Sequence, residues 1–407
     1  MPLGEVGSPA SGAMKTEYGS YFLGIGALVG TIVGVGMFGL PFVAAQSGVG
    51  IALLYVLVFG VLMGLMHYLY FEVALHTKEK HRFTGYVGYY LGPRWKLVTL
   101  LQGLISLWGT LLLYTVVGGE FLAIMGARFL PPSLGDANAM LGIFFFIVSA
   151  AIVLRGSYAV GAQELLFSLP LLLLIVVIFL KAAVSPAFSF SALSTVHISH
   201  AIMPYGITLF ALAGFSVVPT VRVILQKTIA RGQRLNFPLI IFLGTLIPAF
   251  LYALFIIAVV GVNGTATTPD ALSGLRGALG SGTVFWGAIL GVLAIYTSFI
   301  ATGDELKNTF INDYHVPPLL AALFAFLPPL LLYVFQIRNF ILIADIIGSL
   351  MGGYAGIMIL FLWQAMQKKR NAPPIGFFQK CAGWGIGAIF LFASCYSLIE
   401  VFSSFTG

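Results

Sequence analysis

Glycine and proline residues interrupt an apolar stretch that is otherwise suited to cross a bilayer as a helix. The stretch runs from Gly24 to Gln46 and reads GIGALVGTIVGVGMFGLPFVAAQ. An interior glycine weakens a helix by about 1 kcal/mol relative to alanine, and proline removes a backbone donor, so we expect the helix to open between Gly34 and Pro41. Amides and carbonyls freed in hydrocarbon are costly unless they line a cavity or bind a polar ligand. The expected chemistry is therefore binding of a polar solute by backbone dipoles; close helix packing through the same glycines is the alternative.

A second interruption repeats this spacing later in the chain. Gly214 and Pro219 are separated by four residues, as are Gly36 and Pro41. The two segments fall in the first and sixth expected spans, which begin two five-helix sets that start on opposite sides of the membrane. Paired Gly/Pro interruptions in corresponding positions indicate an inverted-repeat transporter with its site between them. We expect helices 1 and 6 to be discontinuous and to face each other.

Two adjacent hydroxyls lie in the eighth apolar span, within LAIYTSFIATGDE. Thr297 and Ser298 follow Ala294 by about one helical turn. Hydroxyls and free carbonyls are hard oxygen ligands that suit a small dehydrated cation. The alternative is that the hydroxyls bond back to the preceding turn of their own helix. One carboxyl, Glu164, falls inside the fifth span, where an ionisable residue is by default a functional candidate; the alternative is that it reaches the inner interface.

These segments are embedded in a chain built almost entirely of apolar spans. Of its 407 residues 59% are hydrophobic and only 8% are charged, which is typical of a polytopic membrane protein. Charge-free windows predict about eleven transmembrane helices. The expected spans are 24–46, 49–75, 96–125, 138–154, 158–181, 201–225, 237–262, 284–302, 317–336, 339–366 and 383–404.

The distribution of basic residues predicts the topology. With the N-terminus in the cytoplasm, Lys and Arg fall on the cytoplasmic side except for Arg128, Lys181, Arg276 and Arg338. An odd number of spans then places the C-terminus outside. The net charge of +7 forms no aromatic-interleaved patch, so we expect no nucleic-acid partner. Residues 1–18 are small and polar and are expected to be disordered, with the first apolar segment retained as a span.

Several motifs resemble those of one permease family. The run LVGTIVGVGMFGLP, Leu28 to Pro41, resembles the first-helix motif of the tryptophan/tyrosine permease family, a branch of the amino acid/auxin permeases in the amino acid-polyamine-organocation superfamily. Glu72-Val73 and Thr297-Ser298-Phe299 are also similar to that family. The broader amino acid/auxin permease pattern is matched in the sixth span by Phe210, Ala211, Gly214 and Pro219. The resemblance covers the chain from about residue 18 to its end.

The resemblance implies a LeuT-like fold of two inverted five-helix repeats plus one extra helix. The repeats would span 19–181 and 199–366, and 382–407 would hold the eleventh helix. In this fold the substrate's carboxylate and ammonium meet the unwound backbones of helices 1 and 6. The matching positions here are Gly34, Val35, Gly36, Met37, Phe210, Ala211, Gly214 and Phe215. Sodium-coupled members hold Na⁺ between helices 1 and 8, at positions that match Gly30, Val33, Ala294, Thr297 and Ser298.

The same resemblance leaves the coupling ion open between Na⁺ and H⁺. Aromatic permeases are generally regarded as proton symporters, whereas the Thr297 and Ser298 pair suits Na⁺, towards which we lean. Some proton-coupled relatives carry a Lys in helix 5, but the fifth span has none before Lys181. Glu164 or Glu120 would then be the proton carrier. No other cofactor is expected.

The function expected is cation-coupled symport of neutral, hydrophobic or aromatic L-amino acids by alternating access across the plasma membrane. An apolar side-chain pocket would be lined by Tyr114, Phe210, Phe215, Tyr296 and Phe299. Proton-coupled transport of serine or threonine is one alternative. A divalent-metal transporter is another, although 210–215 offers neither Met nor carboxylate. An intramembrane enzyme is not expected, because His197 and His200 lie at a span boundary without an acidic partner in range. An amino-acid sensor without transport stays open.

Overall fold

The computed structural model describes residues 9–126, 136–155, 160–230, 235–371, 384–392, 394–396 and 399. All regular elements in these ranges are helical, which confirms the all-α class. The principal helices are α1 (Pro9–Ile32), α2 (Gly36–Ser47), α3 (Val49–Leu75), α4 (Phe83–Leu91), α5 (Pro93–Gly126), α6 (Ala137–Arg155), α7 (Val160–Ala183), α9 (Pro204–Ala211), α10 (Val218–Ile229), α11 (Phe237–Asn263), α13 (Ser281–Asn308), α14 (Pro318–Val334) and α15 (Phe340–Lys369). Short turns of helix connect them, among them α8 (Phe190–Leu193) and α12 (Arg276–Leu279).

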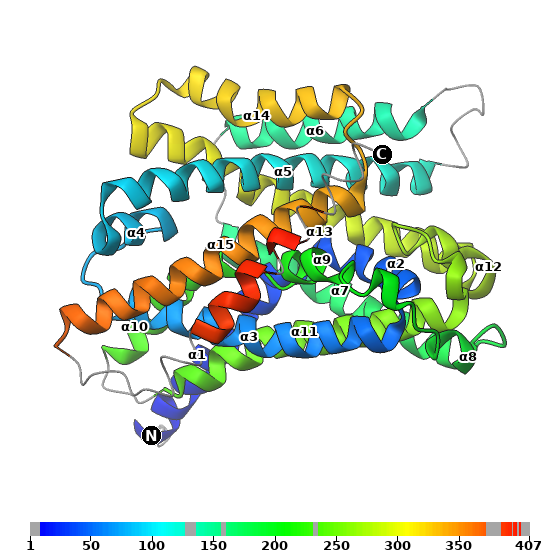
Figure 1. Ribbon diagram of the computed structural model, residues 1–407, viewed down its shortest axis with the longest axis horizontal. Helices are drawn as coiled ribbons and strands as arrows, with labels where there is room; N and C mark the ends of the chain where they lie inside the picture. The colour runs from blue at the N-terminus through cyan, green and yellow to red at the C-terminus, as the bar shows by residue number, and fades with distance from the viewer. Residues whose placement is uncertain are drawn as a thin grey trace, which may run out of the picture.

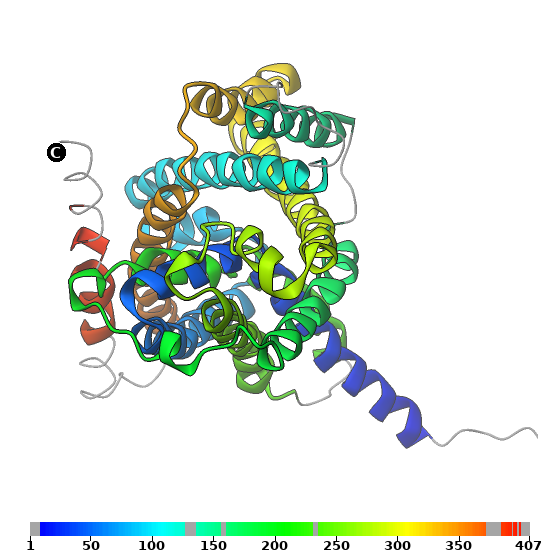
Figure 2. The ribbon, with the colours of Figure 1, turned by 90° about the vertical axis from the view of Figure 1, so that its right-hand side faces the viewer.

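The long helices lie side by side in one bundle (Figure 1). α5, α6 and α14 pack together at the top of that view, and α3 and α11 pack together at the bottom. Figure 2, which looks along the bundle, keeps these two groups apart. α13 and α15 connect them, because α13 contacts both α5 and α7 while α15 contacts both α5 and α9. The centre of the bundle is thus enclosed by helices from both halves of the chain.

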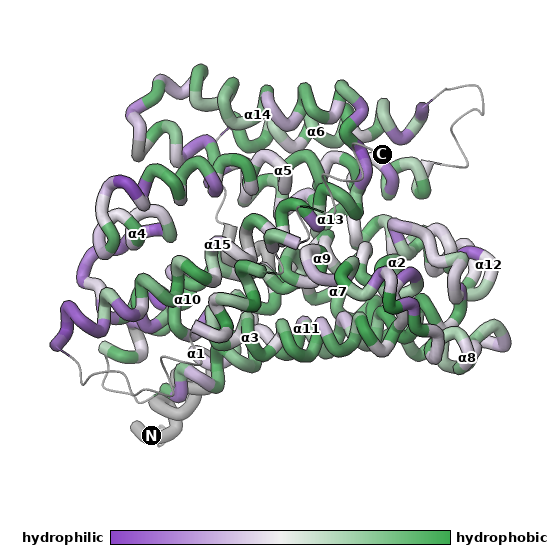
Figure 3. Tube along the Cα trace, viewed as in Figure 1, coloured by the Kyte–Doolittle hydropathy of each residue, from purple (hydrophilic) through white to green (hydrophobic). Residues whose placement is uncertain are grey.

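The distribution of polarity is that of a membrane protein. Apolar residues cover the bodies of the helices, and hydrophilic residues gather at the left and right ends of the bundle (Figure 3). Large apolar side chains such as Leu57, Phe144 and Phe250 are exposed, as expected for surfaces that face lipid. Among the described residues, seven helices are long and apolar enough to cross a membrane, and the α1 and α2 pair adds one bent span. The shorter apolar helices Leu169–Ala183, Pro318–Val334 and Trp384–Tyr396 complete the eleven segments expected.

The first span is broken, as predicted. α1 ends at Ile32 and α2 begins at Gly36, and the two helix axes differ in direction by 59°. The opening covers residues 33–35 only, so it starts one residue earlier than expected and closes before Pro41, which lies inside α2. The flexible glycines on either side of Val35, and not the proline, therefore mark the opening.

The sixth span is also broken. α9 ends at Ala211, a single 3₁₀ turn covers Phe215–Val217, and α10 begins at Val218. The opening starts before Gly214 and closes before Pro219. Pro219 lies in the first turn of α10. Backbone N–H groups in the first turn make no intrahelical hydrogen bond, so the proline removes none. Both prolines thus lie in the half-helix that follows a break.

Two segments differ from the sequence expectation. Residues 9–18, expected to be disordered, continue α1, while residues 1–8 lie outside the described residues. The short helix α4 was not predicted; its polar surroundings and glycines gave no periodic apolar signal, and it packs on α5 and α15. The boundaries of the two repeats, 19–181 and 199–366, and the full extent of the last segment, 382–407, stay predictions.

Candidate functional site

The two broken segments are in direct contact. A methyl group added to Gly36 would lie 2.7 Å from the Cα of Ala211, and one added to Gly214 would lie 2.8 Å from Ile32. Each glycine therefore allows one half-helix to approach the end of the other helix more closely than any side chain would permit. The expectation that the breaks of helices 1 and 6 face each other agrees with this geometry.

Tyr252 of α11 connects the two breaks through one oxygen. Its hydroxyl donates to the carbonyls of Ile32 (2.7 Å) and Ala211 (3.1 Å), which end α1 and α9. The side chain is fully buried. Tyr252 was not among the residues singled out from the sequence. A tyrosine at mid-depth needs a partner for its hydroxyl, and that signal was present in the sequence.

His67 of α3 bonds to the break in helix 6. The backbone amide of Gly214 donates to Nε2 at 3.1 Å, and Nδ1 lies 3.0 Å from Oγ1 of Thr245 on α11. The ring is fully buried, with the Phe215 ring centroid 4.9 Å away. The sequence analysis missed this residue, although a single ionisable group in an apolar span is a recognised signal of function.

The space beside Gly34 is open. A methyl group added to Gly34 would meet no atom within 4 Å outside its neighbours in the chain. Val35 and Met37 are buried, Phe210 lies beside Gly36, and Phe215 is almost fully buried against His67. Tyr114 is half-buried on α5, seven residues after the cavity-lining Leu107 and hence on the same face. The substrate candidates of helices 1 and 6 are thus brought together, with Tyr114 on a wall nearby.

The candidate sodium ligands lie on α1, in the first break and on α13. Within the described residues, α1 packs mainly on α11, α7 and α10, whereas α13 packs mainly on α5 and α7. The Thr297 hydroxyl donates to the carbonyl of Ala294 at 2.9 Å, which is the back-bonding alternative. A methyl on Gly291 would lie 3.4 Å from Phe38 of α2, and Ser298, two turns on, shares that face of α13. Gly291 lies even closer to Phe121 of α5, so this face of α13 is turned towards both α5 and α2. The grouping of Gly30, Val33, Ala294, Thr297 and Ser298 around an ion stays a prediction.

The two proton candidates lie apart from the breaks. Glu120 is on the outer part of α5, and its Oε2 is buried without a hydrogen-bond partner in the part of the chain described. Glu164 lies on α7, and its side chain is outside the described residues. Neither residue has a contact with Gly34 or Gly214 among those described.

One member of the expected aromatic pocket points elsewhere. The Phe299 ring packs against Phe145 (5.8 Å), Phe146 (5.4 Å) and Phe326 (6.3 Å) on α6 and α14. It therefore fills the core between those helices and does not line a pocket at the breaks. The sequence could not distinguish the two faces of α13, because both carry large apolar residues.

A cavity of about 770 Å³ runs from the break in helix 6 to one end of the bundle. That end carries α4, α10 and the N-terminal side of α1, at the left of Figure 1. Residues of the break in helix 6 and one residue just before the break in helix 1 line its inner part, and charged residues of the loop between α3 and α4 and of the end of α13 line its mouth. They include Thr31, Phe215 and Ser216 in the first group and Lys80, His81, Arg82, Asp304 and Glu305 in the second.

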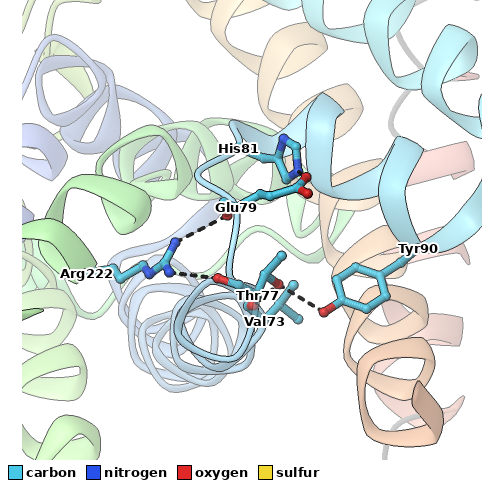
Figure 4. Close-up of polar contacts among 6 residues, drawn as sticks. All are labelled: Val73, Thr77, Glu79, His81, Tyr90 and Arg222. Carbon is cyan, nitrogen blue, oxygen red and sulfur yellow. Dashed lines mark hydrogen bonds and ion pairs between the residues drawn. The ribbon is translucent and has the colours of Figure 1, made fainter. Parts of the chain in front are cut away.

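Buried and ionic contacts hold the mouth of this cavity. Arg222 of α10, only 6% exposed, donates from Nη2 to the carbonyl of Thr77 (2.7 Å) and from Nη1 to that of Glu79 (3.4 Å), both just beyond the end of α3 (Figure 4). The Thr77 hydroxyl in turn bonds to the Val73 carbonyl (2.6 Å) and to the Tyr90 hydroxyl (2.9 Å). α10 is thereby attached to the end of α3, and α3 to α4.

An ion pair crosses the cavity mouth. Arg82 Nη1, just before α4, lies 3.0 Å from Glu305 Oε1 on α13. Because the Arg82 side chain is 60% exposed, this pair is of the weak, solvent-screened kind. No cluster of three or more His, Cys, Asp or Glu residues suited to a metal ion occurs among the described residues.

Comparison with known proteins gives three findings. The model of the tryptophan/tyrosine permease family matches residues 18–400. The "Tyrosine-specific transport system 1" of Haemophilus influenzae is 24% identical over 377 residues, which are 85% of this chain and 88% of that protein. The crystal structure of MhsT in complex with L-phenylalanine is similar with a TM-score of 0.68 and 16% identity, covering 93% of this chain and 98% of that one. The last similarity supports the LeuT-like fold.

Proposed function

This chain belongs to the tryptophan/tyrosine permease family, and from that premise we propose that it is a cation-coupled symporter of neutral, hydrophobic or aromatic L-amino acids. The observation that carries the proposal is the pair of contacting helix breaks, with open space at Gly34 and a cavity that leads from the break in helix 6 to one end of the bundle. A relative named as tyrosine-specific supports an aromatic substrate.

In the proposed mechanism the amino acid binds between the breaks. Its carboxylate would accept hydrogen bonds from amides at the start of α2, where the dipole of that half-helix is positive. Its ammonium would donate to freed carbonyls of the two breaks. The side chain would extend past Phe210, Phe215 and Tyr114. Neither α2 nor α9 contains a charged residue that would compete for the zwitterion.

The cavity implies the direction in which this conformation opens. The positive-inside pattern assigns the end that carries α4 and α10 to the cytoplasm, so the structure would represent an inward-facing state. We propose that the protein lies in the plasma membrane with its N-terminus in the cytoplasm and its C-terminus outside. Closure of this cavity and opening of the opposite side would complete alternating access.

The test of the substrate is counterflow in proteoliposomes. Purified protein is loaded with unlabelled amino acid and offered labelled tryptophan, tyrosine, leucine or serine in turn. We expect tryptophan or tyrosine to exchange fastest, leucine more slowly and serine least. A preference for serine would contradict the proposed substrate class.

The coupling ion is tested with imposed gradients. Thr297 and Ser298 are the candidate sodium ligands, and the double substitution Thr297→Ala with Ser298→Ala should abolish Na⁺ stimulation of uptake, because it removes both hydroxyl oxygens. Uptake is measured with a Na⁺ gradient and a pH gradient applied separately, with Thr283→Ala as a hydroxyl-loss control at the outer end of the same helix. Uptake that ignores Na⁺ in the wild type would exclude the sodium site.

A further inference from the structure

His67 joins a titratable side chain to a freed amide of helix 6. Its ring has no exposed surface, and the mechanism above assigns it no role. Nε2 accepts from the Gly214 amide, and Nδ1 bonds to Thr245. We propose that His67 binds a proton during the transport cycle and that this proton releases the Gly214 amide for the substrate. The inference rests on the proposed transport function and concerns a proton separate from any Na⁺ at Thr297 and Ser298.

The hydrogen bonds fix one neutral tautomer of His67. A backbone amide only donates, so Nε2 must hold a lone pair and the ring hydrogen must lie on Nδ1. Thr245 donates its own hydroxyl hydrogen to the Ile241 carbonyl at 3.0 Å, which leaves its oxygen free to accept from Nδ1. The assignment thus follows from the donors and acceptors present and not from observed hydrogens.

Proton uptake would have a defined local effect. A proton added to the Nε2 lone pair gives an imidazolium with two N–H donors, so Gly214 loses its acceptor and its amide faces another donor. The released amide can then donate to the carboxylate of a zwitterionic amino acid, whose negative charge also offsets the new positive charge. Only one N–H bond forms, and the proton comes from water in the cavity. By linkage, substrate and proton would each increase the affinity for the other.

The cavity provides a route for that proton. Phe215 packs edge-on against the imidazole, with an interplanar angle of 65°, and Phe215 and Ser216 both line the cavity. One side chain therefore separates the ring from the cavity. Because Phe215 belongs to the break itself, a movement of that segment would change both the access of water to His67 and the bond to Gly214.

The surroundings of His67 supply no counter-charge among the described contacts. The helices packed against α3 are α2, α9, α10, α11 and α15, and α2 carries no titratable group. The titratable groups nearest to the ring along the others bond elsewhere. The Tyr252 hydroxyl on α11 bonds to Ile32 and Ala211, and Arg222 on α10 bonds to Thr77 and Glu79. Tyr205 on α9 bonds to Phe390 and Ser394, and Asp345 on α15 lies beside Gly206. On α3 itself, Glu72 bonds to Tyr68 and Trp363. A protonated His67 would thus depend on the bound carboxylate for charge compensation.

The experiment measures protons and amino acid together. Proteoliposomes containing wild type or His67→Gln are loaded with a pH-sensitive dye, and an inward gradient of labelled L-tyrosine is applied. Glutamine offers an acceptor oxygen near the position of Nε2 but does not titrate. We expect the wild type to acidify the lumen as tyrosine enters. The proton flux per tyrosine should fall at least about tenfold in His67→Gln, and its counterflow rate should no longer vary with pH.

Controls separate this inference from the transport function. His67→Phe keeps a ring that neither accepts from Gly214 nor titrates, so its counterflow should also lose its dependence on pH. If His67→Gln does not fold, Thr245→Val removes the acceptor of Nδ1 and should shift the midpoint of the wild-type pH profile. Wild-type tyrosine transport without proton movement, or His67→Gln with the wild-type proton ratio, overturns the inference and leaves the transporter intact. A wild type that moves no amino acid overturns both.

Discussion

Gly34 and Gly36 are two residues apart but have opposite surroundings. A side chain at Gly34 would enter open space, whereas one at Gly36 would enter the backbone of Ala211. Gly34 is also not among the described glycines with positive φ, so alanine fits its backbone. The first glycine therefore provides room for a ligand, and the second provides contact between the two breaks. These different roles make the pair a sharp test of the site.

We predict that Gly34→Ala folds normally and transports poorly. Its methyl would occupy substrate space, so the KM for the preferred amino acid should rise about tenfold, which corresponds to about 1.4 kcal/mol. Gly36→Ala should instead destabilise the protein by about 1 to 3 kcal/mol through overpacking against Ala211. The measurements are the thermal midpoint in detergent and the KM in counterflow. A Gly34→Ala protein with the wild-type KM would remove Gly34 from the substrate site.

At the scale of elements, α10 is attached to the rest of the protein by a buried cation. Arg222 bonds two carbonyls just beyond the end of α3, where helix carbonyls lack intrahelical partners. Arg82 lies at the same cavity mouth but is largely exposed, with Glu305 as its partner. The two arginines thus form contacts of similar length, but the Arg222 side chain is buried and the Arg82 side chain is largely exposed to solvent.

We predict that Arg222→Gln destabilises the protein more than Arg82→Gln. Loss of Arg222 leaves the buried Thr77 carbonyl without this donor, at about 1 to 3 kcal/mol, whereas an exposed ion pair contributes about 0 to 1 kcal/mol. Thermal unfolding of both variants in detergent measures the difference. Because a released α10 would also disturb the break in helix 6, the turnover rate of Arg222→Gln should fall as well. Equal thermal midpoints for the two variants would contradict the role of Arg222.

Sequence was a good guide to elements and a poor guide to contacts between them. The span 49–75 was predicted with the bounds that α3 has, because Gly48 and the polar turn after Leu75 limit an unbroken apolar run. Both breaks were located within a few residues, since glycine weakens a helix whatever surrounds it. The bonds of Tyr252 and His67 to those breaks depend on how α3 and α11 pack. Local composition carries no information on that packing, and for the same reason Phe299 was placed on the wrong face.

At the scale of the whole molecule, the cavity joins the break in helix 6 to the end of the bundle that carries α4 and α10. Its mouth is formed by the loop between α3 and α4 and by the end of α13, on the side that carries α10. The short helix α8, with the exposed Phe190, lies at the opposite end of the bundle. Accessibility from the two sides of a membrane can therefore test both the orientation and the conformation.

We predict that a cysteine at Ser216 reacts only from the cytoplasmic side. Ser216 is exposed to the cavity next to the break in helix 6. In a background with Cys381 and Cys395 replaced by serine, Ser216→Cys should react with a membrane-impermeant maleimide in inside-out vesicles and not in intact cells. Phe190→Cys, as the matched control, should show the reverse. Labelling of both positions from the same side would contradict an inward-facing cavity.

The Tyr252 hydroxyl has one hydrogen and two carbonyl acceptors, so its bond is three-centred and neither acceptor receives it fully. An ammonium that took over the Ala211 carbonyl would leave the whole hydrogen to Ile32, and one that took over Ile32 would leave it to Ala211. Binding of the ammonium at one break would thus strengthen the hydrogen bond from Tyr252 to the other break. The shared hydrogen would in this way couple the two halves of the molecule.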